Sequence, residues 1–184
     1  MFHAALALIE EKGLAEFSLR ALATALEIQV SSLYNHISGQ NELLGAVGCR
    51  EVHMMTKQEQ AISGKHNDEA LFALADAYRL FATEHPELYR IIMGVHTLKL
   101  SVLETEIRKI VAPILTVLSG YGIPLDRQMH YQRILRSIMH GFYAHESTGG
   151  FSYAEIEREA SYRLAVKCVA DALNAERERH DEKR

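Results

Sequence analysis

Apolar residues recur at helical spacing along almost the whole chain, and this pattern restricts the fold more than any other feature. The clearest series lies between residues 126 and 147, where Tyr131, Ile134, Leu135, Ile138, Met139 and Phe142 follow each other at intervals typical of one helix face. The chain has only 3 prolines, and no stretch alternates between apolar and polar residues as a half-exposed strand would. We therefore predict an all-α fold of about nine helices.

Three short helices open the predicted fold, at residues 2–12, 19–26 and 30–36, and a longer helix begins near residue 40. Gly13 is well placed to end the first helix, because a glycine often follows the last helical residue. Ser18 is a good N-cap for the second helix. These helices form an N-terminal three-helix unit, which we assign to residues 1–47. A larger C-terminal bundle of longer helices follows at 48–184.

The second and third short helices have the form of a helix-turn-helix, in which one helix enters the major groove and the other crosses the backbone. Ala23, Leu33 and Ile37 are predicted to pack between them, and Ile28 is predicted to fill the turn as part of this core. The outward face of the third helix carries Val30, Ser31, Ser32, Tyr34, Asn35 and His36. These side chains can reach base edges or phosphates, although any small helical bundle contains short amphipathic pairs.

In the second part of the chain, the same periodicity predicts a helix capped by Asn67 or Asp68, a short helix opened by Pro86, and one over residues 98–119. Pro113 should kink that third helix or mark a junction. Residues 120–124 form a loop, and Asp126 can cap the helix that follows.

The last helix is predicted to begin near Tyr153, and the charged tail 176–184 is predicted to fray. The apolar stripe expected on this helix consists of Ile156, Ala160, Leu164, Cys168, Val169 and Leu173.

Composition narrows the class of protein. No apolar run is long enough for a membrane span, and no signal peptide is visible, so we expect a cytoplasmic protein. Cys49 and Cys168 are far apart and are interpreted as reduced core thiols. No two of the 10 histidines stand four residues apart beside a carboxylate, so we expect no metal and no cofactor.

The charge pattern is unusual for a nucleic-acid-binding protein, because phosphate neutralisation normally supplies much of the affinity. The net charge is −4, and acidic residues outnumber basic ones in the first 50 residues. The basic residues there are Lys12, Arg20 and Arg50, and the acidic ones are Glu10, Glu11, Glu16, Glu27 and Glu42. A DNA-binding function must therefore be argued from the sequence pattern.

Residues 4–47 resemble the N-terminal domain of the TetR/AcrR family of bacterial transcription regulators. The most specific match is Leu33-Tyr34-Asn35-His36-Ile37, where the family has a Leu-Tyr pair followed by a polar residue and a histidine or tyrosine. By this resemblance, phosphates are bound by Ser18, Arg20, Tyr34 and His36. The residues that would face the bases are Gln29, Val30, Ser31, Ser32 and Asn35.

The chain departs from the family pattern in this region. Glu27 stands where the family has a glycine, so a left-handed backbone there is costlier. Gln29 replaces a serine, Ile37 replaces an aromatic residue, and Gln40 replaces a lysine that grips phosphate. The family's basic segment before the first helix is also absent from this sequence. Either native residues precede Met1, or DNA binding is weak and salt-sensitive.

Residues 136–151 resemble the histidine–glycine motif of one group of TetR C-terminal domains, with His140-Gly141 at its centre. His85-Pro86-Glu87-Leu88-Tyr89 resembles that group's short helix. The resemblance implies that the last two helices, about 126–147 and 153–175, pair with their copies in a homodimer. Two recognition helices would then bind a palindromic operator in double-stranded DNA.

By the same resemblance, the middle helices enclose a pocket for a small-molecule effector. The candidate lining residues are Phe72, Tyr78, Phe81, Tyr89, Met93, Met129, Ile138, His140 and Phe142. Plain core packing is the alternative for each of them. His140 is either a hydrogen-bond donor in the pocket or a core group that fixes helix packing.

Three hypotheses for function follow from these patterns. The first is a ligand-responsive, homodimeric DNA-binding repressor. The second is a small-molecule binding or interaction protein of the same fold with weak or lost DNA binding. The third is a helical enzyme that uses His140 or His85, but no nucleophile–base pair or paired carboxylates support it, and we expect no enzymatic activity.

Overall fold

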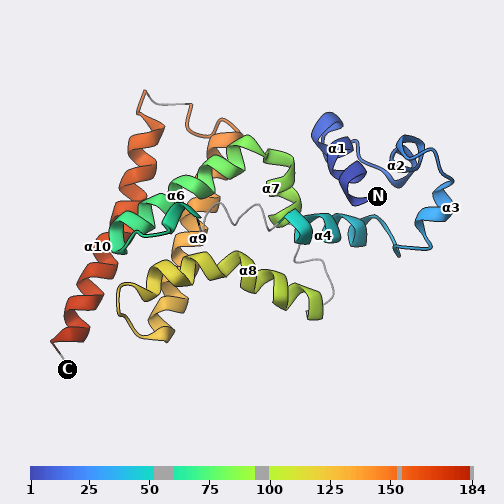
Figure 1. Cartoon of the computed structure of the whole chain (residues 1–184). Helices are drawn as coiled ribbons and strands as arrows, with labels where there is room; N and C mark the ends of the chain where they lie inside the picture. The colour runs from blue at the N-terminus through green and yellow to red at the C-terminus, as the bar shows by residue number, and fades with distance from the viewer. Residues whose placement is uncertain (52–59, 94–99, 153–154, 183–184) are drawn as a thin grey trace. The chain divides into compact units, whose positions relative to one another are not determined.

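The computed structural model describes residues 1–51, 60–93, 100–152 and 155–182, with residues 49–51, 100–107, 109 and 110 described by their backbone alone. Over these ranges the fold is all-α, as predicted, and no helix there is long and apolar enough to cross a membrane (Figure 1). The helices are α1 (Phe2–Lys12), α2 (Leu19–Ala25), α3 (Val30–Leu33), α4 (Gln40–Glu51), α6 (Asn67–Glu84), α7 (Pro86–Met93), α8 (Leu100–Ser119), α9 (Leu125–Ser147) and α10 (Arg158–Asp181).

The chain divides into two compact units. The first comprises Met1–Met54 and Glu84–Arg108, and the second comprises Met55–Thr83 and Lys109–Arg184. Helix α7 therefore belongs to the same unit as α1–α4, although it lies far from them in sequence. The division of function at residue 47 stays a prediction.

The first unit is held together by an apolar core to which all of its short helices contribute. Leu22, Leu33 and Leu43 are almost completely buried in it, and Ile91 of α7 joins the same cluster. Gly13 ends α1 as predicted, at a φ of 84°, where its N–H donates to the carbonyl of Ile9.

A side chain of α7 also satisfies a backbone group of the loop after α1. The Glu87 carboxylate accepts a hydrogen bond from the Leu14 backbone N–H at 2.8 Å. Helix α7 itself begins at Pro86 as predicted, because a proline needs no hydrogen-bond acceptor for its nitrogen in the first turn.

In the second unit, α6 and α8 bury apolar faces as their periodicity predicts. Leu71 and Leu74 of α6 and Leu118 of α8 are completely buried. Of the two alternatives for Pro113, a junction is excluded because α8 continues through it to Ser119, and a kink stays a prediction. Pro113 is itself buried, so the packing of its ring offsets part of the cost of the lost backbone hydrogen bond.

The loop between α8 and α9 is anchored by a buried tyrosine. The Tyr121 hydroxyl donates to the Asp68 carboxylate at 2.7 Å, and the Asn174 amide donates to the same carboxylate at 3.0 Å. Burial, followed by the hydrogen bond to Asp68, raises the pKa of Tyr121 well above its ordinary value. Helix α6 begins at Asn67, and Asp68 in its first turn ties this start to the loop and to α10. The cap at Asn67 or Asp68 stays a prediction.

Three predictions about α9 and α10 are wrong. Asp126 does not cap α9, because the N-cap is Pro124 and Asp126 lies in the first turn. Helix α10 begins at Arg158, and Tyr153 itself lies outside the described residues. The tail does not fray from residue 176. Helix α10 reaches Asp181, and the Glu176 carboxylate binds the Arg127 guanidinium of α9 through two hydrogen bonds of 2.9 Å.

The apolar stripe predicted for the last helix faces solvent along most of its length. Leu164 is 63% exposed and Cys168 is also exposed, whereas the buried face of α10 contains Tyr162, Val166 and Leu173. The interpretation of Cys168 as a core thiol is therefore wrong, and the Cys49 side chain lies outside those described. Helix α10 has two apolar faces, and the part of the chain that the structure describes covers one of them.

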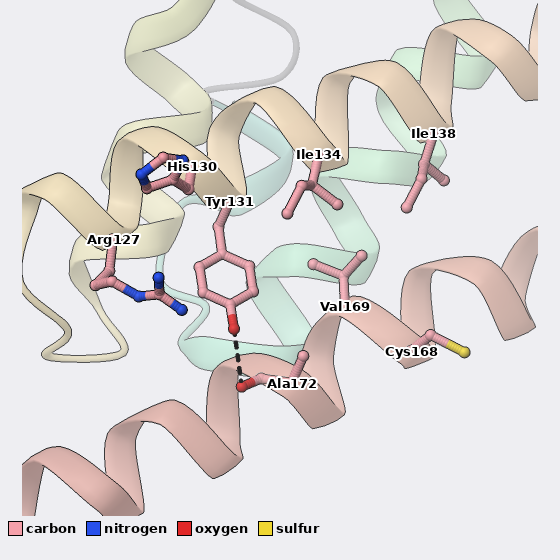
Figure 2. Close-up of a pocket in the computed structure, with 8 residues that line it drawn as sticks. All are labelled: Arg127, His130, Tyr131, Ile134, Ile138, Cys168, Val169 and Ala172. Atoms are coloured by element: carbon pink, nitrogen blue, oxygen red, sulfur yellow. Dashed lines mark hydrogen bonds between the residues drawn. The ribbon is translucent and has the colours of Figure 1, made fainter.

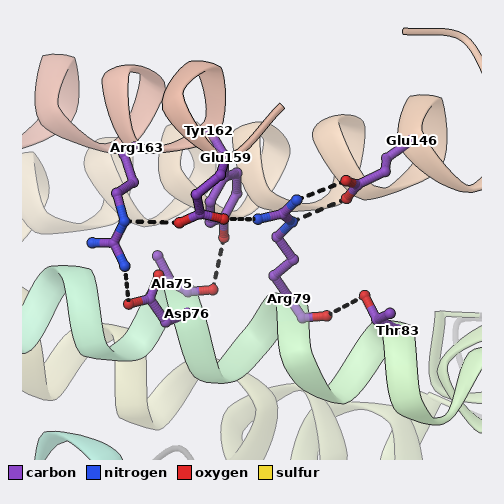
Figure 3. A network of polar contacts seen from close by, with 8 residues as sticks. All are labelled: Ala75, Asp76, Arg79, Thr83, Glu146, Glu159, Tyr162 and Arg163. Atoms are coloured by element: carbon purple, nitrogen blue, oxygen red, sulfur yellow. Dashed lines mark hydrogen bonds and ion pairs between the residues drawn. The ribbon is translucent and has the colours of Figure 1, made fainter. Parts of the chain in front are cut away.

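A network of ion pairs joins α6, α9 and α10 around Arg79 (Figure 3). The Arg79 guanidinium binds Glu146 of α9 at 2.6 and 3.0 Å and also binds Glu159 of α10. Arg163 then binds Glu159 at 2.8 Å and Asp76 of α6 at 2.9 Å. Burial would raise the pKa of Glu159, but hydrogen bonds from Arg79 and Arg163 outweigh it and lower that pKa.

We predict that Arg79→Met destabilises the fold far more than Arg163→Met. The Arg79 and Glu146 side chains are only 20% and 19% exposed, so the substitution leaves a poorly hydrated carboxylate without its partner, at a cost of about 2 kcal/mol. Arg163 and Asp76 are 51% and 44% exposed, so loss of that pair should cost less than about 1 kcal/mol. Urea denaturation followed by circular dichroism measures both values. Equal losses would contradict the prediction.

Candidate nucleic-acid interface

Helix α2 begins at a residue whose side chain caps it, and it ends in a tight turn. The Ser18 hydroxyl accepts a hydrogen bond from the Ala21 backbone N–H at 3.1 Å, as its predicted N-cap role requires. At the other end, the Ile28 N–H donates to the Ala23 carbonyl at 3.0 Å. Ala23 is 2% exposed, and its small side chain allows α2 and α3 to pack closely.

The turn between α2 and α3 contains a strained residue. Glu27 has a φ of 56°, in the left-handed region where the family has glycine, so the predicted conformational conflict is present. The next residue, Ile28, is 42% exposed, and its prediction as a core residue is wrong. The inner side of the turn is already filled by Leu22, Ala23 and Leu33, so the Ile28 side chain lies on the outside.

Helix α3 is shorter than predicted. It ends at Leu33, and residues 34–36 continue as a turn. Leu33 and Ile37 are buried as predicted, at 1% and 5% exposure. They hold the intervening residues outward, and Tyr34 is 55% exposed.

The predicted DNA-facing residues gather on this outer surface. Gln29, Ser31, Asn35 and His36 are exposed, and Val30 and Ser32 are half-buried. Gln29 is the N-cap of α3, but its side chain makes no capping hydrogen bond. The surface therefore presents amide, hydroxyl, imidazole and apolar groups.

Cations are scarce around this surface. Arg20 of α2 is exposed, and the sequence has no further lysine or arginine before Arg50. The Gln40 amide, where the family has a lysine, donates to the Phe17 carbonyl at 3.3 Å, next to the Ser18 cap. At the start of α4, the Glu42 carboxylate accepts from the Ser38 backbone N–H at 2.7 Å. These polar groups support the loops of the first unit.

The predicted ligand-binding residues fall into different environments. Phe72, Tyr78 and Phe81 lie on α6, where Tyr78 and Phe81 are buried. Tyr89 and Met93 lie on α7, in the first unit.

The remaining candidates lie on α9. The Phe142 ring packs against Phe151 and Tyr162 with centroid distances of 4.8 and 5.0 Å. Met129 and His140 are exposed, so His140 is not a core group within a single chain. The use of any of these residues by a ligand stays a prediction.

An open groove of about 470 Å³ runs between α9 and α10 (Figure 2). Its apolar walls include Ile134 and Ile138 of α9 and Val169 of α10, and Cys168 of α10 also lines it. The Tyr131 hydroxyl crosses it to donate to the Ala172 carbonyl at 3.2 Å. Among the described residues, no group of three or more histidine, cysteine or acidic side chains is placed to hold a metal ion.

Taken together, the capped α2, the tight turn and the exposed α3 have the geometry of a helix-turn-helix, the module that places a short helix in the major groove. The amino-acid sequence also matches two family models. Residues 2–47 match the model described as bacterial regulatory proteins, tetR family. Residues 71–169 match the model described as tetracyclin repressor-like, C-terminal domain.

Curated relatives agree with these matches. An uncharacterised HTH-type transcriptional regulator of Mycobacterium tuberculosis is 31% identical over 150 residues, which are 79% of this chain and 67% of that protein. The uncharacterised HTH-type transcriptional regulator YobS of Bacillus subtilis is 30% identical over 141 residues, 76% of this chain and 73% of that protein. This chain belongs to the TetR family of helix-turn-helix DNA-binding transcriptional regulators, which is not a family of enzymes.

Solved structures share the fold. A possible TetR family regulator from Streptomyces coelicolor A3(2) superposes with a TM-score of 0.72 at 19% identity, covering 95% of this chain and 97% of that one. The structure of BioQ with its double-stranded DNA operator superposes with a TM-score of 0.72 at 20% identity, covering 95% of both chains. The DNA contacts of individual residues in this chain stay predictions.

Sequence reasoning missed two features of the site. One is the Gln40–Phe17 hydrogen bond, which no local pattern indicates because it joins residues 23 apart. The other is the groove between α9 and α10, which the spacing of apolar residues on α10 could have indicated. The stripe Leu164, Cys168 and Ala172 repeats every four residues beside the buried face of α10, and a helix with two apolar faces needs two partners.

We predict that Glu27→Gly stabilises the protein, whereas Glu27→Gln does not. Glycine relieves the left-handed strain of about 1–2 kcal/mol but loses more chain entropy on folding, so a net gain of about 0.5–1 kcal/mol is expected. Glutamine removes the same charge and keeps the Cβ atom. Thermal and urea denaturation of the three proteins measure the difference. A similar gain in both variants would mean that charge repulsion, and not the backbone, destabilises the turn.

Proposed function

We propose that this protein is a ligand-responsive, homodimeric repressor that binds a palindromic operator. The observation that carries the proposal is the outer surface of α3, where Leu33 and Ile37 are buried and Tyr34 and Asn35 face solvent. BioQ, which shares the fold, is described in complex with its DNA operator. A regulator that binds the chromosome must share its compartment, so we infer a cytoplasmic location.

Dimerisation is supported by the uncovered apolar surface of α9 and α10. Ile134 lines the groove and is 47% exposed, and Leu164 is 63% exposed and precedes the groove-lining Cys168 by four residues, so it lies on the same side of α10. Contiguous apolar surface of this kind marks sites of protein association, and a twofold interface uses the same patch on both copies. A second copy of this chain is the occupant that we propose, since pairing through these helices would place two α3 helices on two half-sites.

For the response to a ligand, we propose a site lined by Phe72, Tyr78, Phe81, Ile138 and Phe142, all of which lie in the second unit. Their aromatic and aliphatic side chains would favour an apolar effector. In one state of the dimer the two α3 helices match the two half-sites of the operator, and in another they do not. A ligand can release the protein from DNA only if it binds the second state more tightly than the first. Repression is the output that such a release mechanism implies.

Three features of the sequence favour a second candidate function, in which the fold binds small molecules or proteins but has weak or lost DNA binding. The first unit is acidic, Glu27 stands in the turn, and Gln40 replaces the phosphate-binding lysine of the family. Fewer cations release fewer counterions from DNA, so the affinity and its dependence on salt both fall.

We predict that full-length protein binds duplex DNA from upstream of its own gene at low salt, and that Gln40→Lys binds it more tightly. The new lysine adds one phosphate contact per protomer, so the slope of log affinity against log salt should steepen by about two for a dimer. Fluorescence anisotropy titrations at several salt concentrations measure this slope.

Gln40→Met is the matched control, because it loses the hydrogen bond to Phe17 without adding charge. Its salt slope should equal that of the parent protein. If the parent protein, with its natural N-terminus, binds no duplex even at low salt, the second candidate function is the correct one.

A separate prediction concerns the dimer. Leu164→Glu and Ile134→Glu should each convert the dimer to a monomer of 20.8 kDa, because dimerisation would bury an unpaired carboxylate. Leu80→Glu on α6 is the matched control, since Leu80 is 57% exposed but lies outside the groove. Sedimentation equilibrium measures the masses. A monomeric parent protein, or three variants that all remain dimeric, would contradict the proposed interface.

A further inference from the structure

The outer surface of α3 lacks the side chains that most often select guanine. Arginine and lysine bind guanine O6 and N7 in the major groove, and this is the commonest specific contact between protein and DNA. Between Arg20 and Arg50 the chain has neither residue. Whatever α3 reads, it must read with uncharged groups or with histidine.

The groups that are present match the other base pair. Gln29 and Asn35 flank the helix, and both are exposed, with no hydrogen bond from either side-chain amide to the described part of the chain. A glutamine or asparagine amide can donate to adenine N7 and accept from adenine N6 at the same time. Two amides, one before and one after α3, therefore provide two adenine-binding groups for one half-site.

The apolar residues of this surface match thymine. Ile28 is 42% exposed and Val30 is half-buried, and they lie on either side of Gln29 in sequence. The thymine methyl group is the only apolar group that a base presents in the major groove. Contact with it would cover the exposed part of the Ile28 side chain.

The neighbouring polar groups do not oppose this match. Ser31 and Ser32 can bond to any base edge. The exposed carboxylate of Glu27 accepts only, and it can accept from the amino group of adenine as well as from that of cytosine. The polar side chains of Gln29, Ser31, Ser32 and Asn35 therefore do not favour a G·C pair over an A·T pair, and His36 is assigned to a phosphate.

We propose that α3 selects A·T base pairs within each operator half-site, through adenine contacts of Gln29 and Asn35 and thymine-methyl contacts of Ile28 and Val30. This inference rests on the proposed DNA-binding function. The base preference would come from side-chain amides that bind adenine and from apolar side chains that contact the thymine methyl group.

The first experiment selects operators from a random duplex library with purified full-length protein at low salt, and repeats the selection with Gln29→Ala and Asn35→Ala. Positions at which these variants lose preference are the positions read by α3, and we expect A·T pairs there. Gln29→Arg should change one of these pairs to G·C in each half-site, with about a tenfold change in relative affinity. Tyr34→Phe is the control and should keep the parent preference, because Tyr34 is assigned to a phosphate.

The second experiment replaces thymine by deoxyuridine at the selected positions, which removes the methyl group and leaves every hydrogen-bonding group in place. Each replacement that removes a methyl group in contact with α3 should lower the affinity about fourfold. The Ile28→Ala and Val30→Ala variants should lose this sensitivity, and Tyr34→Phe should retain it.

Two results would overturn the inference, and they differ from a failure of the proposed function. Selection of G·C pairs at the positions read by Gln29 and Asn35, or equal affinity for thymine and deoxyuridine operators, would refute A·T selection by α3 while DNA recognition stands. Binding with no sequence preference, or no binding to any duplex, would refute the proposed operator function and this inference with it.

Discussion

The placement of α3 depends on the apolar core that it shares with α1, α2 and α4. Leu22, Ala23 and Leu33 are each at most 2% exposed in that core, and Ile37 closes it after the turn. Burial of such side chains contributes about 1.5–3 kcal/mol for each large residue, far more than an exposed ion pair would. Because packing holds α3 and the Ser18 cap holds the neighbouring helix α2, the exposed polar side chains on the outer surface of α3 are left available for DNA.

Features set by local sequence were predictable, and features set by a distant partner were not. The end of α1 at Gly13, the Ser18 cap and the inner faces of α2 and α3 each depend on residues a few positions apart. By contrast, α10 extends to Asp181 with Glu176 bound to Arg127, which lies 49 residues earlier. The spacing of apolar residues along a helix also cannot show whether they pack in the core of the chain or in an interface with another molecule. The stripe at Leu164 and Cys168 is apolar and helical, yet the described residues leave it exposed.

The departures from the family pattern have different physical consequences. Glu27 keeps the left-handed turn that glycine makes easy, so the turn geometry is retained at a cost in stability. Gln40 gives up a charge but bonds to the Phe17 carbonyl, so its role moves from phosphate binding to support of the loop before α2. Ile28 is exposed because the core beside it is already full. The sequence pattern predicts a core residue at this position, and the exposed side chain is instead a candidate for contact with a base.

A reading surface with few cations need not be a poor sensor of sequence. Phosphate contacts strengthen binding to every duplex alike, so their loss lowers specific and non-specific affinity together. Amide and methyl contacts form only with matching bases. Their share of the binding free energy grows as the share from phosphate contacts falls. Specificity in a genome depends on the ratio of the two affinities and not on the specific affinity alone. Pairing through α9 and α10 would present two such surfaces to one operator, and the second would bind at a high effective concentration once the first is in place.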